Sequence, residues 1–237
     1  MFPLYDENRP LRKPVVNYIL IALNVIVFFY FYLQGTRVFQ RAIMAYGMIP
    51  LYLLNGINLH TLLTSMFMHG SIEHLLGNML YLYIFGDNVE DALGHLGYLM
   101  FYLISGIGAS LVHTLSIFLM PLDLQSYSLG IPAVGASGAI SGILGAYMLL
   151  YPYAKIRTIV LYWYFFIISV PAYYYIGFWF VYQLMMGVIS LRLPIGVAFW
   201  AHIGGFVTGL LLIKFLNVKP GPKRRIVTRY VVPIEWE

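Results

Sequence analysis

Several long stretches of this chain contain no Asp, Glu, Lys or Arg, and five of them are candidates for membrane-spanning helices. They cover 21 to 34 residues each and are rich in Leu, Ile, Val, Phe and Tyr. A helix of about 20 residues spans the roughly 30 Å hydrocarbon core of a bilayer, so each stretch can hold one membrane-spanning helix. The stretches are Pro14–Thr36, Ala92–Leu122, Leu124–Ala154, Thr158–Leu191 and Leu193–Ile213.

A sixth segment, Gly70–Leu93, is uncharged over Leu75–Gly86 and carries charged residues only toward its ends. With this segment the sequence predicts six helices, which places both termini on one side of the membrane. The runs are continuously apolar and do not alternate as the strands of a membrane barrel do. The predicted fold class is an all-α integral membrane protein with six transmembrane helices.

Composition supports this class. Apolar residues make up 61% of the 237 residues and charged residues 10%, whereas soluble domains are about 45–50% apolar and about 25% charged. These values exclude a soluble globular protein, and they exclude disorder, which requires few apolar residues. The absence of Cys excludes disulfides, a thiol nucleophile and thiolate metal sites.

The basic residues predict the orientation. If the N-terminus is cytoplasmic, 11 of the 14 Lys and Arg residues fall in cytoplasmic segments, as the positive-inside rule requires. The net charge of +5 is thus a topological signal and does not indicate nucleic acid. We expect a multi-pass cell-membrane protein with a cytoplasmic N-terminal segment (1–14), a six-helix domain (15–217) and a cytoplasmic basic tail (218–237).

Polar side chains within these segments need a reason, because a membrane interior makes them costly. His74 and Asn78 are four residues apart and therefore share one face of a helix. Two such donors can hold a developing negative oxygen. They can equally bond to a neighbouring helix, and taken alone the pair favours such packing.

Ser137 follows a stretch that contains Pro132 and Gly135, which stops any helix running through it. A helix that begins near Ser137 would have free backbone N–H groups in its first turn, where an anion is favoured. The alternative is that Ser137 is only an N-cap, the commoner role of a serine at a helix start.

Small residues form stripes on two of the predicted helices, and such stripes let helices approach closely. This approach would bring together Ser137 and His202, which lie near the outer ends of their helices. A serine and a histidine at one depth are best explained as nucleophile and general base. The stripes comprise Gly138, Gly142 and Gly145 on the fourth helix, and Gly205 and Gly209 on the sixth.

No carboxylate completes a triad. Asp123 is the acidic residue nearest to Ser137 in sequence, and a solvated position suits it better. A Ser–His dyad avoids an unpaired carboxylate in a low dielectric. A metalloprotease is disfavoured because there is no His-Glu-x-x-His motif. A transporter or channel is disfavoured because the long runs contain no charged residue and no repeat was found.

Three motifs together resemble the rhomboid family of intramembrane serine proteases. They are His-x-x-x-x-His-x-x-x-Asn at 69–78, Gly-x-Ser-Gly at 135–138 and Ala-His-x-x-Gly-x-x-x-Gly at 201–209. Gly-x-Ser-Gly alone is a weak signal, whereas the three motifs in order on the expected helices are a strong one. The resemblance covers roughly Val15–Leu216 and implies a six-helix rhomboid bundle of the prokaryotic type.

The resemblance implies a role for each of these residues. Ser137 would be the nucleophile, and His202 the general base and acid. The oxyanion hole would consist of His74, Asn78 and the backbone N–H of Ser137. His69 is similar to the family's structural histidine. The positions implied to serve structure and helix packing are His69, Gly135, Gly138, Gly142, Gly205 and Gly209.

The resemblance also implies cleavage of transmembrane protein substrates near their outer ends, in the lipid bilayer, without a metal or cofactor. Helix five and the segment Met186–Gly196 would act as gate and cap. Two places depart from the family. Many members carry Trp-Arg in the first outer loop, where ungapped counting back from His69 puts His60-Thr61. Many members carry, four residues after the serine, an aromatic residue that stacks on the catalytic histidine, and here this residue is Ser141. What orients His202 is therefore open.

A second hypothesis keeps the same fold without the chemistry. A non-catalytic relative would bind transmembrane clients for retention or degradation and would not need the dyad. Both Ser137 and His202 are present, which favours the protease. Labelling by a fluorophosphonate probe would distinguish the two.

Overall fold

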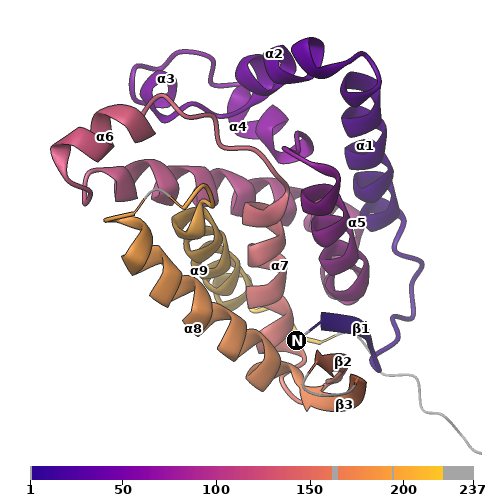
Figure 1. The fold of residues 1–237 in the computed structure, drawn as a ribbon. Coiled ribbons are helices and arrows are strands. Elements are labelled where there is room, and N and C mark those ends of the chain that lie inside the picture. The colour runs from indigo at the N-terminus through magenta and orange to yellow at the C-terminus, as the bar shows by residue number, and fades with distance from the viewer. Residues whose placement is uncertain (1, 162–164, 194, 221–237) are drawn as a thin grey trace, which may run out of the picture.

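The computed structural model describes residues 2–161, 165–193 and 195–220. The expected basic tail, 218–237, therefore lies almost wholly outside the described residues. Most of the described chain is helical (Figure 1). The five longest helices are α1 (Val15–Tyr32), α5 (Ile72–Ile117), α7 (Ser137–Leu150), α8 (Ala172–Ser190) and α9 (Phe199–Phe215).

Three of these helices, α1, α5 and α8, are long and apolar enough to cross a membrane by length and composition. The helices α7 and α9 are apolar but shorter, with 14 and 17 residues. The mostly helical membrane fold class agrees with the sequence, whereas the number of six crossings stays a prediction.

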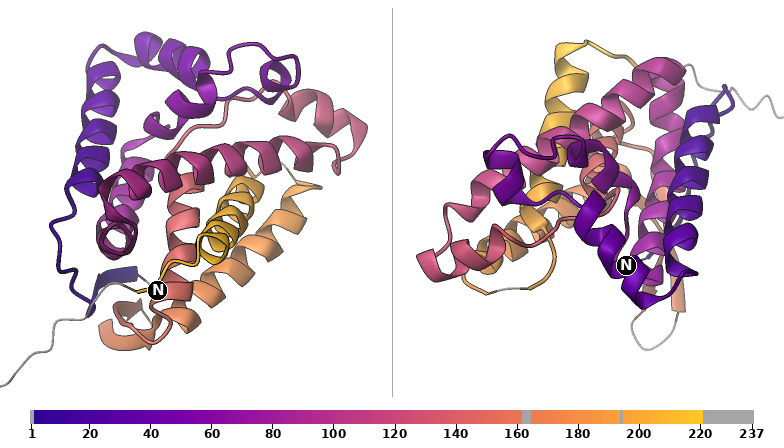
Figure 2. Two further views of the ribbon diagram at one scale, coloured as in Figure 1. Left: turned by 180° about the vertical axis from the view of Figure 1, so that it is seen from behind. Right: turned by 90° about the horizontal axis from the view of Figure 1, so that it is seen from above.

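The 46-residue helix α5 is two helices joined at a kink. Gly94 has φ 72° and ψ 167°, a conformation that L side chains rarely adopt. The chain changes direction sharply here, so that the two halves of α5 run along different axes (Figure 2). The charge pattern predicted separate segments on either side of this point, Gly70–Leu93 and Ala92–Leu122.

Between α1 and α5 the chain forms short helices at one end of the bundle (Figure 1). A further short helix, α6, follows α5. These elements are α2 (Thr36–Tyr46), α3 (Pro50–Leu54), α4 (Thr61–Thr64), the 3₁₀ helix η1 (Ser65–Phe67) and α6 (Leu122–Ser128).

The all-α prediction is wrong for a small sheet at the opposite end of the bundle. The strands β1 (Phe2–Asp6), β2 (Lys155–Leu161) and β3 (Phe165–Pro171) pair antiparallel in the order β1-β2-β3. The hairpin β2–β3 uses the first half of the uncharged run Thr158–Leu191, and only the second half forms α8. This first half is rich in Ile, Val, Thr and Phe, which favour strands.

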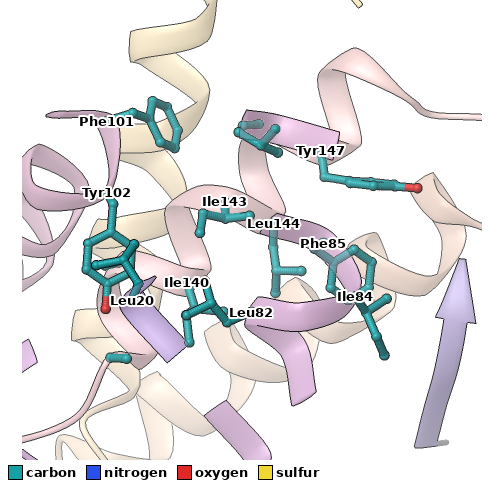
Figure 3. Close-up of a cluster of buried hydrophobic side chains, with 14 of the residues drawn as sticks. Leu20, Leu82, Ile84, Phe85, Phe101, Tyr102, Ile140, Ile143, Leu144 and Tyr147 are labelled. Atoms are coloured by element: carbon teal, nitrogen blue, oxygen red, sulfur yellow. The ribbon is translucent and has the colours of Figure 1, made fainter. Parts of the chain in front are cut away.

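The core lies where α5, α7 and α9 meet (Figure 3). Leu82 and Phe85 of α5 are fully buried beside Ile143 of α7, and Phe206 of α9 belongs to the same cluster. Close packing of these three helices fixes the relative positions of residues that are more than 60 positions apart in sequence. The candidate site is built from such residues.

Candidate active site

Ser137 is the first residue of α7. The helix starts here because Pro132 and Gly135 precede it, and Gly135 has φ +124°. Any side chain at Gly135 would meet the ring of His74, with a Cβ only 2.8 Å from Cε1. The N-cap position is held by Ala136, and no side-chain cap is formed. The Ser137 hydroxyl is thus not a helix cap, which was the alternative interpretation.

The Ser137 hydroxyl lies 3.0 Å from Nε2 of His202. His202 stands in the first turn of α9, so the starts of two helices meet at this point. Asp123 is exposed in α6 and is not among the hydrogen-bond partners of His202.

The glycines of α7 and α9 make this proximity possible. A Cβ on Gly205 would overlap the carbonyl oxygen of Gly138, and one on Gly209 would overlap that of Gly142. Gly138 and Gly142 also contact the second half of α5, through Ala109 and Ser105. The two helices are therefore in backbone contact, as glycine stripes permit.

His74 and Asn78 lie on the first turns of α5, on the face toward Gly135. Asn78 is 7% exposed. Its Nδ2 is buried and has no hydrogen-bond partner among the described residues. Buried donors are nearly always paired in folded proteins. This unpaired donor, which lies close to Gly135, is therefore a candidate partner for a bound group.

His69 lies in the loop before α5 and is fully buried. Its ring packs edge-to-face against that of His74, with centroids 5.1 Å apart. The contact supports the orientation of the His74 ring.

The Ser141 hydroxyl donates to the Ser137 carbonyl oxygen at 2.6 Å and is not among the hydrogen-bond partners of His202. Other rings approach His202 instead. Trp179 of α8 lies 6.2 Å away, tilted by 33°, and Phe199 lies 6.3 Å away, nearly perpendicular. A further residue, Gln183 of α8, places its amide oxygen Oε1 2.9 Å from Nδ1 of His202 as a hydrogen-bond acceptor. Sequence reasoning missed Trp179 and Gln183.

A cavity of about 710 Å³ opens over these groups. Its lining contains His74, Asn78, Ser137 and His202, together with His113 of α5. This volume suits a short stretch of extended peptide or several water molecules. Among the described residues, no group of three or more His, Asp or Glu side chains is arranged to hold a metal ion.

Comparison with known sequences agrees with this arrangement. The rhomboid domain family model matches residues 56–218, more than half of the chain. The chain belongs to the rhomboid family. The matched region contains all three motifs and every residue that the site brings together.

Individual rhomboid relatives are about one-third identical to this chain. Rhomboid protease GluP of Bacillus subtilis (strain 168) is 34% identical over 134 residues, 56% of this chain and 24% of that protein. RHOMBOID-like protein 4 of Arabidopsis thaliana is 34% identical over 159 residues, 67% and 34% of the two chains. Rhomboid protein 1, mitochondrial, of Saccharomyces cerevisiae is 30% identical over 198 residues, which are 82% of this chain and 51% of that protein. The chain thus spans between about a quarter and a half of the length of these relatives.

Proposed function

We propose that this protein is an intramembrane serine endopeptidase that hydrolyses peptide bonds of transmembrane protein substrates through a Ser137–His202 dyad. The observation that carries the proposal is the 3.0 Å separation between the Ser137 hydroxyl and His202 Nε2, in a cavity that His74 and Asn78 also line. The name of the relative GluP, a rhomboid protease, supports the same reaction class.

The first half of the reaction forms an acyl-enzyme. The Ser137 oxygen attacks the carbonyl carbon of the substrate peptide bond while its proton passes to Nε2 of His202. The negative oxygen of the tetrahedral intermediate accepts hydrogen bonds from Asn78 Nδ2, the His74 ring and the backbone N–H of Ser137. His202 then donates its proton to the leaving amine as the C–N bond breaks.

The second half of the reaction hydrolyses the acyl-enzyme and regenerates the free enzyme. A water molecule in the cavity attacks the ester carbonyl, and His202 takes its proton. The same donors hold the second tetrahedral intermediate. Collapse of this intermediate returns the proton to the Ser137 oxygen and frees the new carboxylate of the substrate.

The membrane arrangement completes the proposal. Six segments cross the bilayer of the cell membrane: α1, the two halves of α5, α7, α8 and α9. Both termini are cytoplasmic, which leaves the sheet on the cytoplasmic side and the cavity near the outer face. The helix α7 is about 21 Å long at 1.5 Å per residue, shorter than the hydrocarbon core. Ser137 then lies below the outer surface, where water enters through the cavity.

The substrate is a transmembrane helix that unwinds near its outer end. Unwinding frees backbone groups that lipid cannot satisfy, whereas a polar cavity can. Substrates with weak helix formers such as Gly near the cleaved bond are therefore preferred.

Cleavage of labelled transmembrane substrates in liposomes tests the proposal. The intact protein should cleave a panel of such substrates, and Ser137→Ala and His202→Ala should not. Full cleavage by Ser137→Ala would refute the nucleophile, and full cleavage by His202→Ala would place the base elsewhere. Insensitivity to chelators is expected for both halves of the reaction.

A further inference from the structure

One buried polar side chain on α8 has no explanation in helix packing. Between positions 181 and 185 of this helix four residues are exposed, while Gln183 is 4% exposed. Gln183 is also the one amide-bearing residue of Ala172–Ser190. A buried amide in an apolar, membrane-facing helix costs free energy unless it has a partner. Its partner here is Nδ1 of His202, 2.9 Å from Oε1 of the amide.

This contact decides which nitrogen of His202 carries the hydrogen. A carbonyl oxygen only accepts hydrogen bonds, so Nδ1 must be the N–H donor when Oε1 faces it. The lone pair of the neutral ring then lies on Nε2, the atom 3.0 Å from the Ser137 hydroxyl. This is the tautomer that a general base requires.

The chemistry of an amide suits this position. When His202 takes the serine proton, the ring becomes an imidazolium, and Oε1 continues to accept from Nδ1–H. A carboxylate would hold the cation more strongly but would itself be a buried charge that must be paired in the resting enzyme. An amide fixes the ring without that cost. It performs the orienting role that no Asp or Glu performs at this site.

A second contact ties the same parts of α8 and α9 together. Nε1 of Trp200 donates to the carbonyl oxygen of Gly187 at 2.9 Å. Gly187 lies one turn after Gln183, and Trp200 lies two residues before His202. The side chain of Ile203 fills the space where a Cβ on Gly187 would lie, 3.0 Å from its Cδ1. The Gln183 amide is therefore held at a fixed distance from the imidazole by neighbouring contacts.

We infer that Gln183 is a positioning residue of this site, which holds His202 in the Nδ1–H tautomer and makes the dyad a Ser–His–Gln arrangement. The inference rests on the proposed function for its effect on rate. Because Gln183 comes from α8 and the dyad comes from α7 and α9, the base is correctly oriented only while α8 is packed against α9. Any opening of the bundle on the side of α8 would break the contact and slow the chemical step.

Three variants test this inference. Gln183→Met keeps the length and volume of the side chain but removes the acceptor. Gln183→Glu keeps an acceptor oxygen in the same place. Val181→Ala, at a side chain of α8 that is 61% exposed, controls for changes in the helix itself. Each is compared with the wild type and with Ser137→Ala for kcat and KM on a transmembrane substrate in liposomes.

We expect Gln183→Met to lower kcat by roughly ten- to hundredfold, a part of the roughly 10²–10⁴-fold that a positioned acid–base group supplies, with KM unchanged. Gln183→Glu should keep kcat within about tenfold of the wild-type value. The control Val181→Ala should have the wild-type kcat. A wild-type kcat in Gln183→Met, or equal losses in Gln183→Met and Gln183→Glu, would overturn the inference.

A second measurement does not depend on activity. In protein labelled with ¹⁵N-histidine, the signals that disappear in His202→Ala belong to His202. They should report the Nδ1–H tautomer in the wild type and a mixture in Gln183→Met. The Nε2–H tautomer in the wild type would overturn the inference. If Ser137→Ala cleaves like the wild type, the proposed function fails, while the ¹⁵N signals still decide the hydrogen bond.

Discussion

The two ends of the bundle treat buried polar groups in opposite ways. At the end that carries the sheet, called here the sheet end, both oxygens of Glu90 are bonded, to the backbone N–H groups of Val16 and Asn17 at 2.9 and 2.7 Å. The carboxylate of Asp91 accepts from the N–H groups of residues 11 and 12 in the same way. At the cavity end, the buried amide donor of Asn78 has no partner among the described residues.

A second cluster at the sheet end shows the same saturation. Asp6 of β1 accepts from the Tyr147 hydroxyl and from Nδ2 of Asn88. Asn88 in turn accepts from Asn8 at 2.7 Å. These bonds fasten the N-terminal strand to α5 and α7. The comparison teaches that buried polar residues with several bonded partners hold this fold together, whereas a buried polar donor without a partner next to the cavity is a candidate for chemistry.

Ser137→Ala makes the sharpest separation between the two ends. The change removes one oxygen from a half-buried position that caps no helix. We expect cleavage to fall by about 10⁴-fold or more, with no loss of thermal stability. The measurement is substrate cleavage in liposomes beside a melting curve in detergent. A variant that melts early would mean that this hydroxyl is structural.

Two asparagines of α5, ten residues apart, form a matched pair. Asn78→Ala removes an unpaired donor at the cavity end, and we expect kcat to fall by roughly 10²–10³-fold with little change in stability. Asn88→Ala breaks bonds at the sheet end. It should leave kcat near the wild-type value and lower the free energy of unfolding by about 1–3 kcal/mol. A loss of stability in Asn78→Ala together with a loss of kcat in Asn88→Ala would contradict the roles assigned to the two ends.

Glu90→Ala tests the sheet end alone. The change leaves the N–H groups of Val16 and Asn17 without acceptors at the start of α1. We expect a loss of roughly 2 kcal/mol in unfolding free energy and an unchanged kcat in the protein that remains folded. Denaturant titration followed by circular dichroism measures the first quantity. An unchanged titration midpoint would show that these bonds contribute nothing net.

The last expected effect is a dependence of stability on pH at the sheet end. Burial raises the pKa of Asp6 from 3.8 to about 6, although hydrogen bonds from Tyr147 and Asn88 oppose the shift. The folded protein therefore binds a proton more tightly than the unfolded chain, and stability falls as pH rises from about 4 to 6. We expect a decrease of roughly 1–3 kcal/mol across this window, and a smaller decrease in Asp6→Asn. Parallel stability curves for the two proteins would contradict the assignment.

The parts of the fold that the sequence predicted depend on local signals. The charged residues Asp87, Glu90 and Asp91 lie near the end of the first half of α5, and the kink at Gly94 lies just beyond them. Pro132 and Gly135 predicted a helix start near Ser137, which is confirmed. The approach of α7 and α9 follows from glycine spacing, since a Cβ on Gly205 or Gly209 would overlap a carbonyl oxygen of α7.

What could not be predicted depends on the third dimension. The run Thr158–Leu191 has no charge and no clear period, and such a run does not distinguish a strand from a helix. The hairpin in its first half was therefore missed. Gln183 was missed because its role depends on the rotation of α8 about its axis. One signal was present in the sequence: an amide in an otherwise apolar helix.

Fluorophosphonate labelling tests the central claim most directly, because it asks whether the hydroxyl at the start of α7 is activated by the histidine on α9. The probe is added to the protein in liposomes, and the adduct is located by mass spectrometry of the digested protein. We predict a single adduct on Ser137 that is absent from His202→Ala. An adduct on another residue, or undiminished labelling of Ser137 in His202→Ala, would contradict the dyad.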